Sequence, residues 1–471
     1  MLIRSAGMHD GTVADVCIDG ASVTAIGMHL QARPGEALLE ARGGALLPGL
    51  HDHHVHMMAL ATSLQSLRCG PPEVSTAAEL ERRLRQRDAL PIEGDDEWIR
   101  GIGYHESVAG DIDRAWLDRV VPSRCVRIQH RSGRLWILNS RGLERLAPSA
   151  ADSRVTRMRS PAGLAQGRVL DADSWLRARL GGRPPSLHRV SALLSSHGVT
   201  GVTDASAANT RREQQYFLEV TARGELVQQV IVMGDASLNA AIDTGLVRCG
   251  PTKIYLRESA LPETEELRAW ILRSHAARRP VAVHCVTDAE LVFAVAAIAE
   301  VGSRPGDRIE HASVAPPELV SLLAEQRLTV VTQPNFVRER GDTYLAEVPA
   351  GDRPWLYRGR GFLDAGIRLA AGTDAPLGDP NPWLAMQAAI DRRTTGGRTL
   401  GEAESLSPEE ALALFSGEPL APGGGLNRIT IGSPADLCLL DRPWSDARRN
   451  LAATRVSATV QRGRLVWQRA R

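Results

Sequence analysis

The sequence predicts an α/β protein in which a (β/α)8 barrel of the TIM type carries a small β-sandwich domain built from both termini. From about residue 197, short β-prone runs alternate with helical patterns, which is typical of a parallel sheet that closes into a barrel. Both ends of the chain instead alternate polar and apolar residues around hairpin turns. The length of 471 residues suits a barrel of roughly 250 to 400 residues with an attached module.

The N-terminal segment predicts a β-hairpin, because residues 12–18 and 23–26 flank the turn Asp19-Gly20. The C-terminal segment repeats the pattern. Short hairpins need a partner sheet for stability, so we expect residues 1–47 and 425–471 to form one composite β-domain. The C-terminal strands are expected at 435–440, 456–460 and 465–467.

The barrel is assigned to residues 48–424, with a first strand counted from the apolar run just before it. An insertion at about residues 59–187 is too long for a simple connection, and we expect it to form a lid or a pocket wall. Helices are expected at 263–272, 288–299 and 317–323. Strands are expected at 45–47, 198–203, 226–232, 252–256, 280–284, 308–311, 328–332 and 367–371.

The composition excludes several classes of partner. Hydrophobic content of 43%, charged content of 24% and a formal charge of +1 are ordinary for a globular protein and argue against a nucleic-acid or anionic-membrane surface. The start lacks a secretory signal pattern, and no apolar run reaches the length of a membrane span, so a cytoplasmic location is expected. A small-molecule substrate is the expected partner, and a homo-oligomer is compatible with the sequence.

Lysine occurs once in this chain. Lys253 is the single lysine among the 56 lysines and arginines. Arginine keeps its proton in proteins, whereas a desolvated lysine can become a neutral, nucleophilic amine. Such an amine reacts with carbon dioxide to form a carbamate, which can bridge two metal ions. Lys253 lies in a β-prone run that predicts a buried strand.

The expected barrel strands end in residues that can bind metal. In a parallel barrel the chemistry lies at the carboxyl ends of the strands, so these side chains should converge. His54 and His56 lie two apart and face the same side of an extended chain. The nitrogen and oxygen donors suit zinc or a similar divalent ion. The full candidate set is His54, His56, Lys253, His284, His311 and Asp374.

In this order, and following Pro48-Gly49-Leu50, these residues resemble the amidohydrolase superfamily. Further motifs are similar to its amidohydrolase-3 branch. The resemblance implies one or two divalent ions, zinc foremost, held by the paired histidines, a carbamylated Lys253, two further histidines and Asp374. The branch motifs are Trp98–Tyr104, Asn139-Ser140, Arg308–His311, Gln333-Pro334 and Gly372–Pro376.

The resemblance implies hydrolysis of an amide or cyclic amide C–N bond by a metal-bound hydroxide, with Asp374 as the catalytic proton shuttle. A lactone or ester hydrolase stays open, because the same hydroxide attacks either carbonyl. A deaminase on the same barrel typically lacks a carbamate, so Lys253 argues against it. A non-catalytic scaffold usually loses ligands, and here none is missing.

Two residues of the insertion are candidates for binding substrate, Tyr104 and Arg134. Where the branch tends to have a histidine, this chain has Arg134 in Ser132-Gly133-Arg134, and an arginine there can meet a substrate carboxylate. The strand that ends at His284 also departs from the branch, because Cys285-Val286-Thr287 replaces its small residues. The substrates of relatives therefore do not transfer directly.

Overall fold

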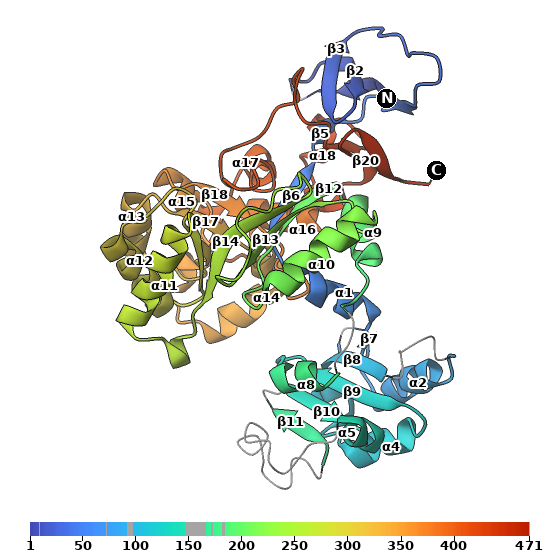
Figure 1. Cartoon of the computed structure of the whole chain (residues 1–471), viewed down its shortest axis with the longest axis vertical. Coiled ribbons are helices and arrows are strands. Elements are labelled where there is room, and N and C mark those ends of the chain that lie inside the picture. The colour runs from blue at the N-terminus through green and yellow to red at the C-terminus, as the bar shows by residue number, and fades with distance from the viewer. Residues whose placement is uncertain are drawn as a thin grey trace. The chain divides into compact units, whose positions relative to one another are not determined.

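The chain divides into two compact units. The computed structural model describes residues 1–8, 10–71, 73–91, 98–146, 166–170, 173–180 and 184–470 (Figure 1). The first unit comprises Met1–Leu60 together with Ser186–Arg471, and the second comprises Ala61–Pro185. No helix among these described residues is long and apolar enough to cross a membrane.

The first unit contains an eight-stranded parallel barrel. Its strands follow the order β18-β17-β16-β15-β14-β13-β12-β6, and every neighbouring pair within this order is parallel. Most strand residues are buried, as expected when helices cover the outside of a parallel sheet. The strands are β6 (Leu50–Val55), β12 (Val199–Asp204), β13 (Gln229–Gly234), β14 (Val247–Tyr255), β15 (Val281–Cys285), β16 (Arg308–His311), β17 (Thr329–Thr332) and β18 (Leu369–Ala371).

Helices alternate with these strands, and Figure 1 shows several of them along the outside of the barrel. The three helices expected at 263–272, 288–299 and 317–323 are confirmed as α11 (Thr264–Ala276), α12 (Asp288–Val301) and α13 (Pro317–Glu325). The other helices of this unit are α1 (Met57–Gln65, which runs into the second unit), α9 (His188–Ser196), α10 (Arg211–Ala222), α14 (Asn335–Glu347), α15 (Arg360–Asp364), α16 (Pro382–Asp391), α17 (Pro408–Ala413) and α18 (Trp444–Ala447). Short 3-10 turns are η1 (Glu258–Ala260), η2 (Arg353–Trp355), η3 (Glu402–Glu404) and η4 (Leu451–Ala453).

The expected first barrel strand at 45–47 is wrong. That run forms β5 (Leu46–Pro48), which pairs antiparallel with β19 (Leu437–Leu440) in another sheet. The first barrel strand is β6, whose residues 51–54 are all polar and buried. Local hydrophobicity favours the apolar run over β6, because β6 carries polar side chains where an ordinary buried strand carries apolar ones.

The barrel closes between β18 and β6. The Asp374 backbone N–H donates to the His54 carbonyl at 2.8 Å, and the Thr373 N–H donates to Asp52 Oδ1 at 3.0 Å. Gly372 makes this approach possible, because a Cβ there would lie 2.4 Å from the His54 backbone nitrogen. The end of strand eight is therefore held against strand one, next to two predicted metal ligands.

Both termini contribute to the small β-sandwich that the sequence predicts. One sheet has the order β3-β2-β1-β4, and the other has the order β21-β20-β19-β5. Ile3, Val16 and Val23 share one buried hydrophobic cluster with Leu437 and Val460. The remaining strands are β1 (Leu2–Gly7), β2 (Val13–Asp19), β3 (Ser22–Gly27), β4 (Leu38–Glu40), β20 (Val456–Gln461) and β21 (Arg464–Gln468). The fold class is thus as predicted.

The second unit contains a five-stranded sheet in the order β11-β10-β9-β8-β7. Its core includes Ile99, Val126, Ile128 and Leu117. Its strands are β7 (Leu67–Arg68), β8 (Trp98–Tyr104), β9 (Cys125–His130), β10 (Leu135–Leu138) and β11 (Arg168–Leu170). Its helices are α2 (Ala77–Asp88), α3 (Glu106–Ala109), α4 (Arg114–Val120), α5 (Ser140–Leu146) and α8 (Asp173–Leu180). A role of this unit as a lid stays a prediction.

Candidate metal centre

The predicted metal ligands lie at or near the carboxyl ends of five barrel strands. Parallel strands bring these ends to one rim of the barrel, which is where such folds place their chemistry. The residues are His54 in β6 and His56 just after it, Lys253 in β14, His284 in β15, His311 at the end of β16 and Asp374 after β18.

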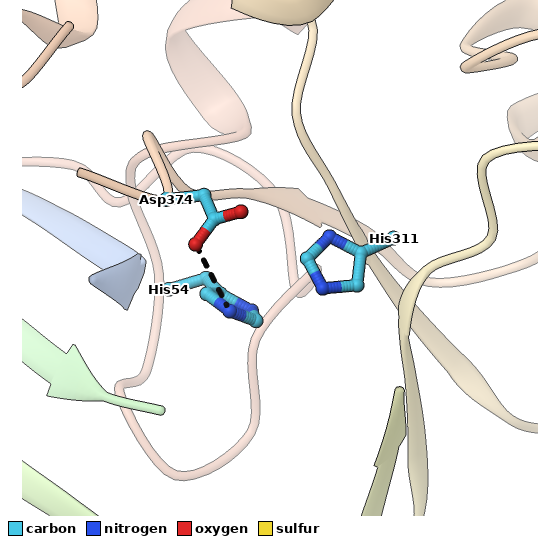
Figure 2. A group of neighbouring side chains, drawn as sticks. All are labelled: His54, His311 and Asp374. Atoms are coloured by element: carbon cyan, nitrogen blue, oxygen red, sulfur yellow. Dashed lines mark ion pairs between the residues drawn. The ribbon is translucent and has the colours of Figure 1, made fainter. Parts of the chain in front are cut away.

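His54, His311 and Asp374 form the centre of this group (Figure 2). All three are buried, and each places a ligand atom within 4.8 Å of those of the other two. Asp374 Oδ1 lies 3.6 Å from His54 Nε2, and the rings of His54 and His311 are 4.7 Å apart. Two imidazoles and a carboxylate at this spacing can bind one divalent ion.

His56 and His284 extend the group on two sides. His56 Nε2 lies 3.1 Å from Asp374 Oδ1, while its Nδ1 lies 3.0 Å from the Ser206 hydroxyl. The His284 ring lies 4.4 Å from the His311 ring in an edge-on arrangement. The structure therefore links all four histidines and Asp374 through direct contacts.

Lys253 places a buried amine at the same end of the barrel. The residue is 6% exposed, and among the described residues its Nζ has no hydrogen-bond partner. The closest carboxylate is Glu310, whose Oε2 lies 4.0 Å away. Burial lowers the pKa of Lys253 to about 8, although the charges of Glu310 and Asp374 oppose this shift. A buried ammonium without a hydrogen-bond partner is costly, so the neutral amine, and with it a modified amine, is more accessible here than at an exposed lysine.

Glu310 is a further residue of this group, and the sequence alone predicts no role for it. It is fully buried, accepts a bond from Arg308 Nε at 2.6 Å and contacts His54 Nδ1. Although burial raises its pKa, the charges of Arg308 and Lys253 and the contact with His54 hold the pKa of Glu310 well below its usual range. The available signal was Arg308-Ile309-Glu310, since strand alternation puts Arg308 and Glu310 on one face.

Two contacts fix which imidazole nitrogen is available. His54 Nδ1 faces the Glu310 carboxylate, and His311 Nδ1 lies 2.6 Å from Gln333 Oε1. Both partners accept hydrogen bonds, so each Nδ1 donates its proton and leaves the lone pair on Nε2. Metal-ligating histidines are commonly oriented in this way by a second layer of acceptors.

His311 and Asp374 both have left-handed backbones. Their φ angles are 71° and 54°, in a region that residues other than glycine seldom adopt. Such conformations persist where the surrounding structure holds them, and they concentrate at functional sites. At His311 the left-handed backbone ends the strand alternation, which allows both Glu310 and His311 to contact His54.

The ionisation of these side chains fits a metal ion. Burial lowers the pKa of His54 to about 3 and the pKa of His284 still further, so both rings are neutral at pH 7. Although burial raises it, the surrounding imidazoles, His56 foremost, hold the pKa of Asp374 below its usual range. Neutral imidazoles and an ionised carboxylate are the forms that ligate metals. The imidazole and carboxylate ligands therefore fit a divalent-metal site, as does the Lys253 amine, which has no hydrogen-bond partner among the described residues.

Gln333→Ala is expected to weaken metal binding by about ten- to a hundredfold. Without the Gln333 oxygen that accepts the hydrogen bond from His311 Nδ1, the His311 ring is no longer held in one orientation. Titration of the metal-free protein against a competing chelator measures the affinity. Gln215→Ala, at an exposed position of α10, is the matched control. Equal affinities in the two variants would show that Gln333 does not orient the ligand.

Tyr104 and Arg134, the predicted substrate-binding residues, belong to the second unit. Tyr104 is buried, and its hydroxyl donates to the Gly110 carbonyl at 2.6 Å. Arg134 is exposed, and its backbone N–H donates to the Ser132 hydroxyl at 3.3 Å. Their roles in binding substrate stay predictions.

Known proteins resemble this chain along almost its whole length. N-substituted formamide deformylase of Arthrobacter pascens is 23% identical, with 99% of this chain and 97% of that protein aligned. The putative amidohydrolase YtcJ of Bacillus subtilis is 22% identical, with 92% of this chain and 90% of that protein aligned.

Solved structures share the fold. An uncharacterized metal-dependent hydrolase from Pyrococcus horikoshii superposes with a TM-score of 0.76 at 19% identity, covering 94% of this chain and 96% of its own. N-isopropylammelide isopropylaminohydrolase from Burkholderia multivorans has a TM-score of 0.55 at 15% identity, covering 99% of this chain and 98% of its own.

A sequence profile of the amidohydrolase family matches residues 37–467. This range includes all eight barrel strands and every predicted metal ligand. The chain therefore belongs to the amidohydrolase family.

Proposed function

We propose that this protein is a metal-dependent hydrolase that cleaves the C–N bond of an amide or cyclic amide. The observation that carries the proposal is the cluster of buried and half-buried imidazoles around Asp374, beside a Lys253 amine that has no hydrogen-bond partner among the described residues. Two relatives whose names describe the release of an amine or a formyl group from nitrogen are consistent with this reaction class.

Six residues would hold one or two divalent ions, with zinc as our proposal for the metal. His54, His56, His284 and His311 would supply imidazole nitrogens, and Asp374 would supply a carboxylate. Lys253, as a carbamate, would supply a second anionic ligand at a position where the unmodified amine has no hydrogen-bond partner among the described residues. Divalent ions bound there lower the pKa of water toward about 7 and polarise a carbonyl oxygen.

Asp374 is the proposed catalytic acid and base. Its Oδ1 faces His54 and His56, and the residue is only 3% exposed. It accepts the proton of the attacking water and then donates that proton to the leaving nitrogen. Its carboxylate is held ionised between turnovers by the surrounding imidazoles. The end of strand eight is held against strand one, because the Thr373 N–H donates to Asp52 and Gly372 lets the two backbones come close. This contact keeps Asp374 beside His54.

A lactone or ester hydrolase is the second candidate, because the same arrangement polarises an ester carbonyl. A deaminase is disfavoured by the buried Lys253 at the centre, and a non-catalytic scaffold by the complete ligand set. The kind of substrate that is hydrolysed, an amide or an ester, therefore distinguishes the first two candidates.

The test is a turnover assay on protein loaded with zinc, compared with the same protein after chelation. The panel contains N-acyl amines, N-acyl amino acids, cyclic amides, lactones and an aminated ring. We expect hydrolysis of at least one amide class, loss of that activity on chelation, and recovery on return of the ion. Turnover confined to lactones would favour the second candidate, and activity that survives chelation would contradict a metal mechanism.

A further inference from the structure

A cavity of about 560 Å³ opens beside the candidate metal centre within the first unit. Its lining includes His284 of β15 and the run from the last residue of β14 into the following loop, with Tyr255, Arg257 and Ser259 among these residues. Tyr255 pairs in register with His284 on the adjacent strand. The cavity therefore begins at a predicted metal ligand and continues along the loop after strand four.

Two side chains of this cavity lie one after the other outward from His284, first the Tyr255 ring and then the Arg257 guanidinium. The Tyr255 ring lies 4.4 Å from the His284 ring, and the Arg257 guanidinium lies 5.2 Å from the Tyr255 ring. Tyr255 is 50% exposed, although a large aromatic side chain is normally covered. Arg257 is also exposed, and no carboxylate of the described residues pairs with it.

The loop that carries Arg257 is held in place by Glu290 of α12. The buried Glu290 carboxylate accepts bonds from the backbone N–H groups of Glu258 at 2.8 Å and of Val286 at 2.7 Å. These bonds join the loop after β14 to the loop after β15. Because the buried Glu290 carboxylate accepts these two hydrogen bonds, the charged side chains exposed at the cavity surface are those of Arg257 and Glu258.

We propose that Arg257, stacked on Tyr255, binds a carboxylate of the substrate, so that the amides cleaved here carry an acidic group near the scissile bond. The inference rests on the proposed hydrolytic function and names the class of its substrate, of which N-acyl amino acids are members. A guanidinium offers two parallel donors that match a carboxylate, and an aromatic face limits its motion before the ligand arrives. The Tyr255 ring, between Arg257 and His284, provides the surface for the chain that joins the carboxylate to the amide.

The proposed binding of a substrate carboxylate by Arg257 can be tested with the variant Arg257→Ala and a matched pair of amides. N-acetyl-leucine, as both enantiomers, and N-isopentylacetamide differ by the carboxylate alone. Wild type is expected to favour the acidic amide by about tenfold or more in kcat/KM, mainly through KM, because charge-assisted hydrogen bonds exceed neutral ones. Arg257→Ala should reduce that preference to near unity, by lowering kcat/KM for N-acetyl-leucine far more than for N-isopentylacetamide. Arg273→Ala, at an exposed position of α11, is the control and should behave as wild type.

Calorimetric titration with the same two compounds provides a readout that does not need turnover. N-acetyl-leucine should bind wild type and the control and lose about tenfold or more in affinity to Arg257→Ala. An acidic amide that binds wild type no better than its neutral partner, or that keeps its advantage in Arg257→Ala, overturns the inference. If amides of neither kind are hydrolysed while the carboxylate still binds through Arg257, the hydrolytic proposal fails and this binding site stands.

Discussion

Lys253→Ala is expected to lose most of its bound metal and at least about a thousandfold in kcat/KM. A metal ion contributes several kcal/mol of charge stabilisation to the transition state, and every 1.4 kcal/mol corresponds to a tenfold change. The Lys253 amine has no hydrogen-bond partner among the described residues. A carbamate on it would add a second anionic ligand to the histidines and Asp374. Elemental analysis gives the metal content, and steady-state rates give the loss of activity.

Two further measurements separate a carbamate from a simple amine. A short carboxylate such as propionate should partly restore metal and activity to Lys253→Ala, because it can occupy the space left by the side chain. Lys253→Arg keeps the positive charge, cannot form a stable carbamate and should be inactive without rescue. Wild-type protein supplied with ¹³C-bicarbonate should show a carbamate carbon by NMR. Full metal content and normal rates in Lys253→Ala would show that the lysine is incidental.

The general architecture could be predicted from the sequence because the barrel repeats a strong local pattern. Seven of the eight barrel strands lie where apolar, β-prone runs were found, and α11, α12 and α13 follow helical periodicity. The first barrel strand could not be predicted in the same way. Its buried positions carry His51, Asp52, His53 and His54, so burial there is set by contacts with other strands and not by local hydrophobicity.

The candidate ligands could be predicted because they occupy strand ends, a property that can be read along the chain. The partners that orient them could not be assigned in the same way. Glu310 meets His54 across 256 positions of sequence, and Gln333 meets His311 through the neighbouring strand. Arg257 acquires its proposed role only from the cavity and the Tyr255 ring beside it. Contacts of this kind depend on the closed barrel and are invisible to local periodicity.

Asp374→Asn is expected to reduce kcat by about 10² to 10⁴, the usual contribution of a positioned acid or base. Asparagine keeps the size of the side chain and one ligand oxygen but cannot accept and return a proton. The fold should survive, because the hydrogen bond that helps to close the barrel runs from the Asp374 backbone N–H to the His54 carbonyl, and asparagine keeps it. Rates at saturating substrate and metal, together with the thermal unfolding midpoint, measure both effects.

Asp379→Asn is the matched control for this substitution. Asp379 is exposed on the same segment, and its Oδ1 accepts a bond from the Asn381 N–H at 2.9 Å, a role that an asparagine oxygen can keep. The control should therefore retain metal, stability and rate. A decrease in kcat confined to Asp374→Asn, with most metal still bound, assigns the loss to proton transfer, because a positional defect would lower metal content in proportion. Equal rates in both variants would remove Asp374 from the chemistry and move the search for the acid and base to Glu310 and the histidines.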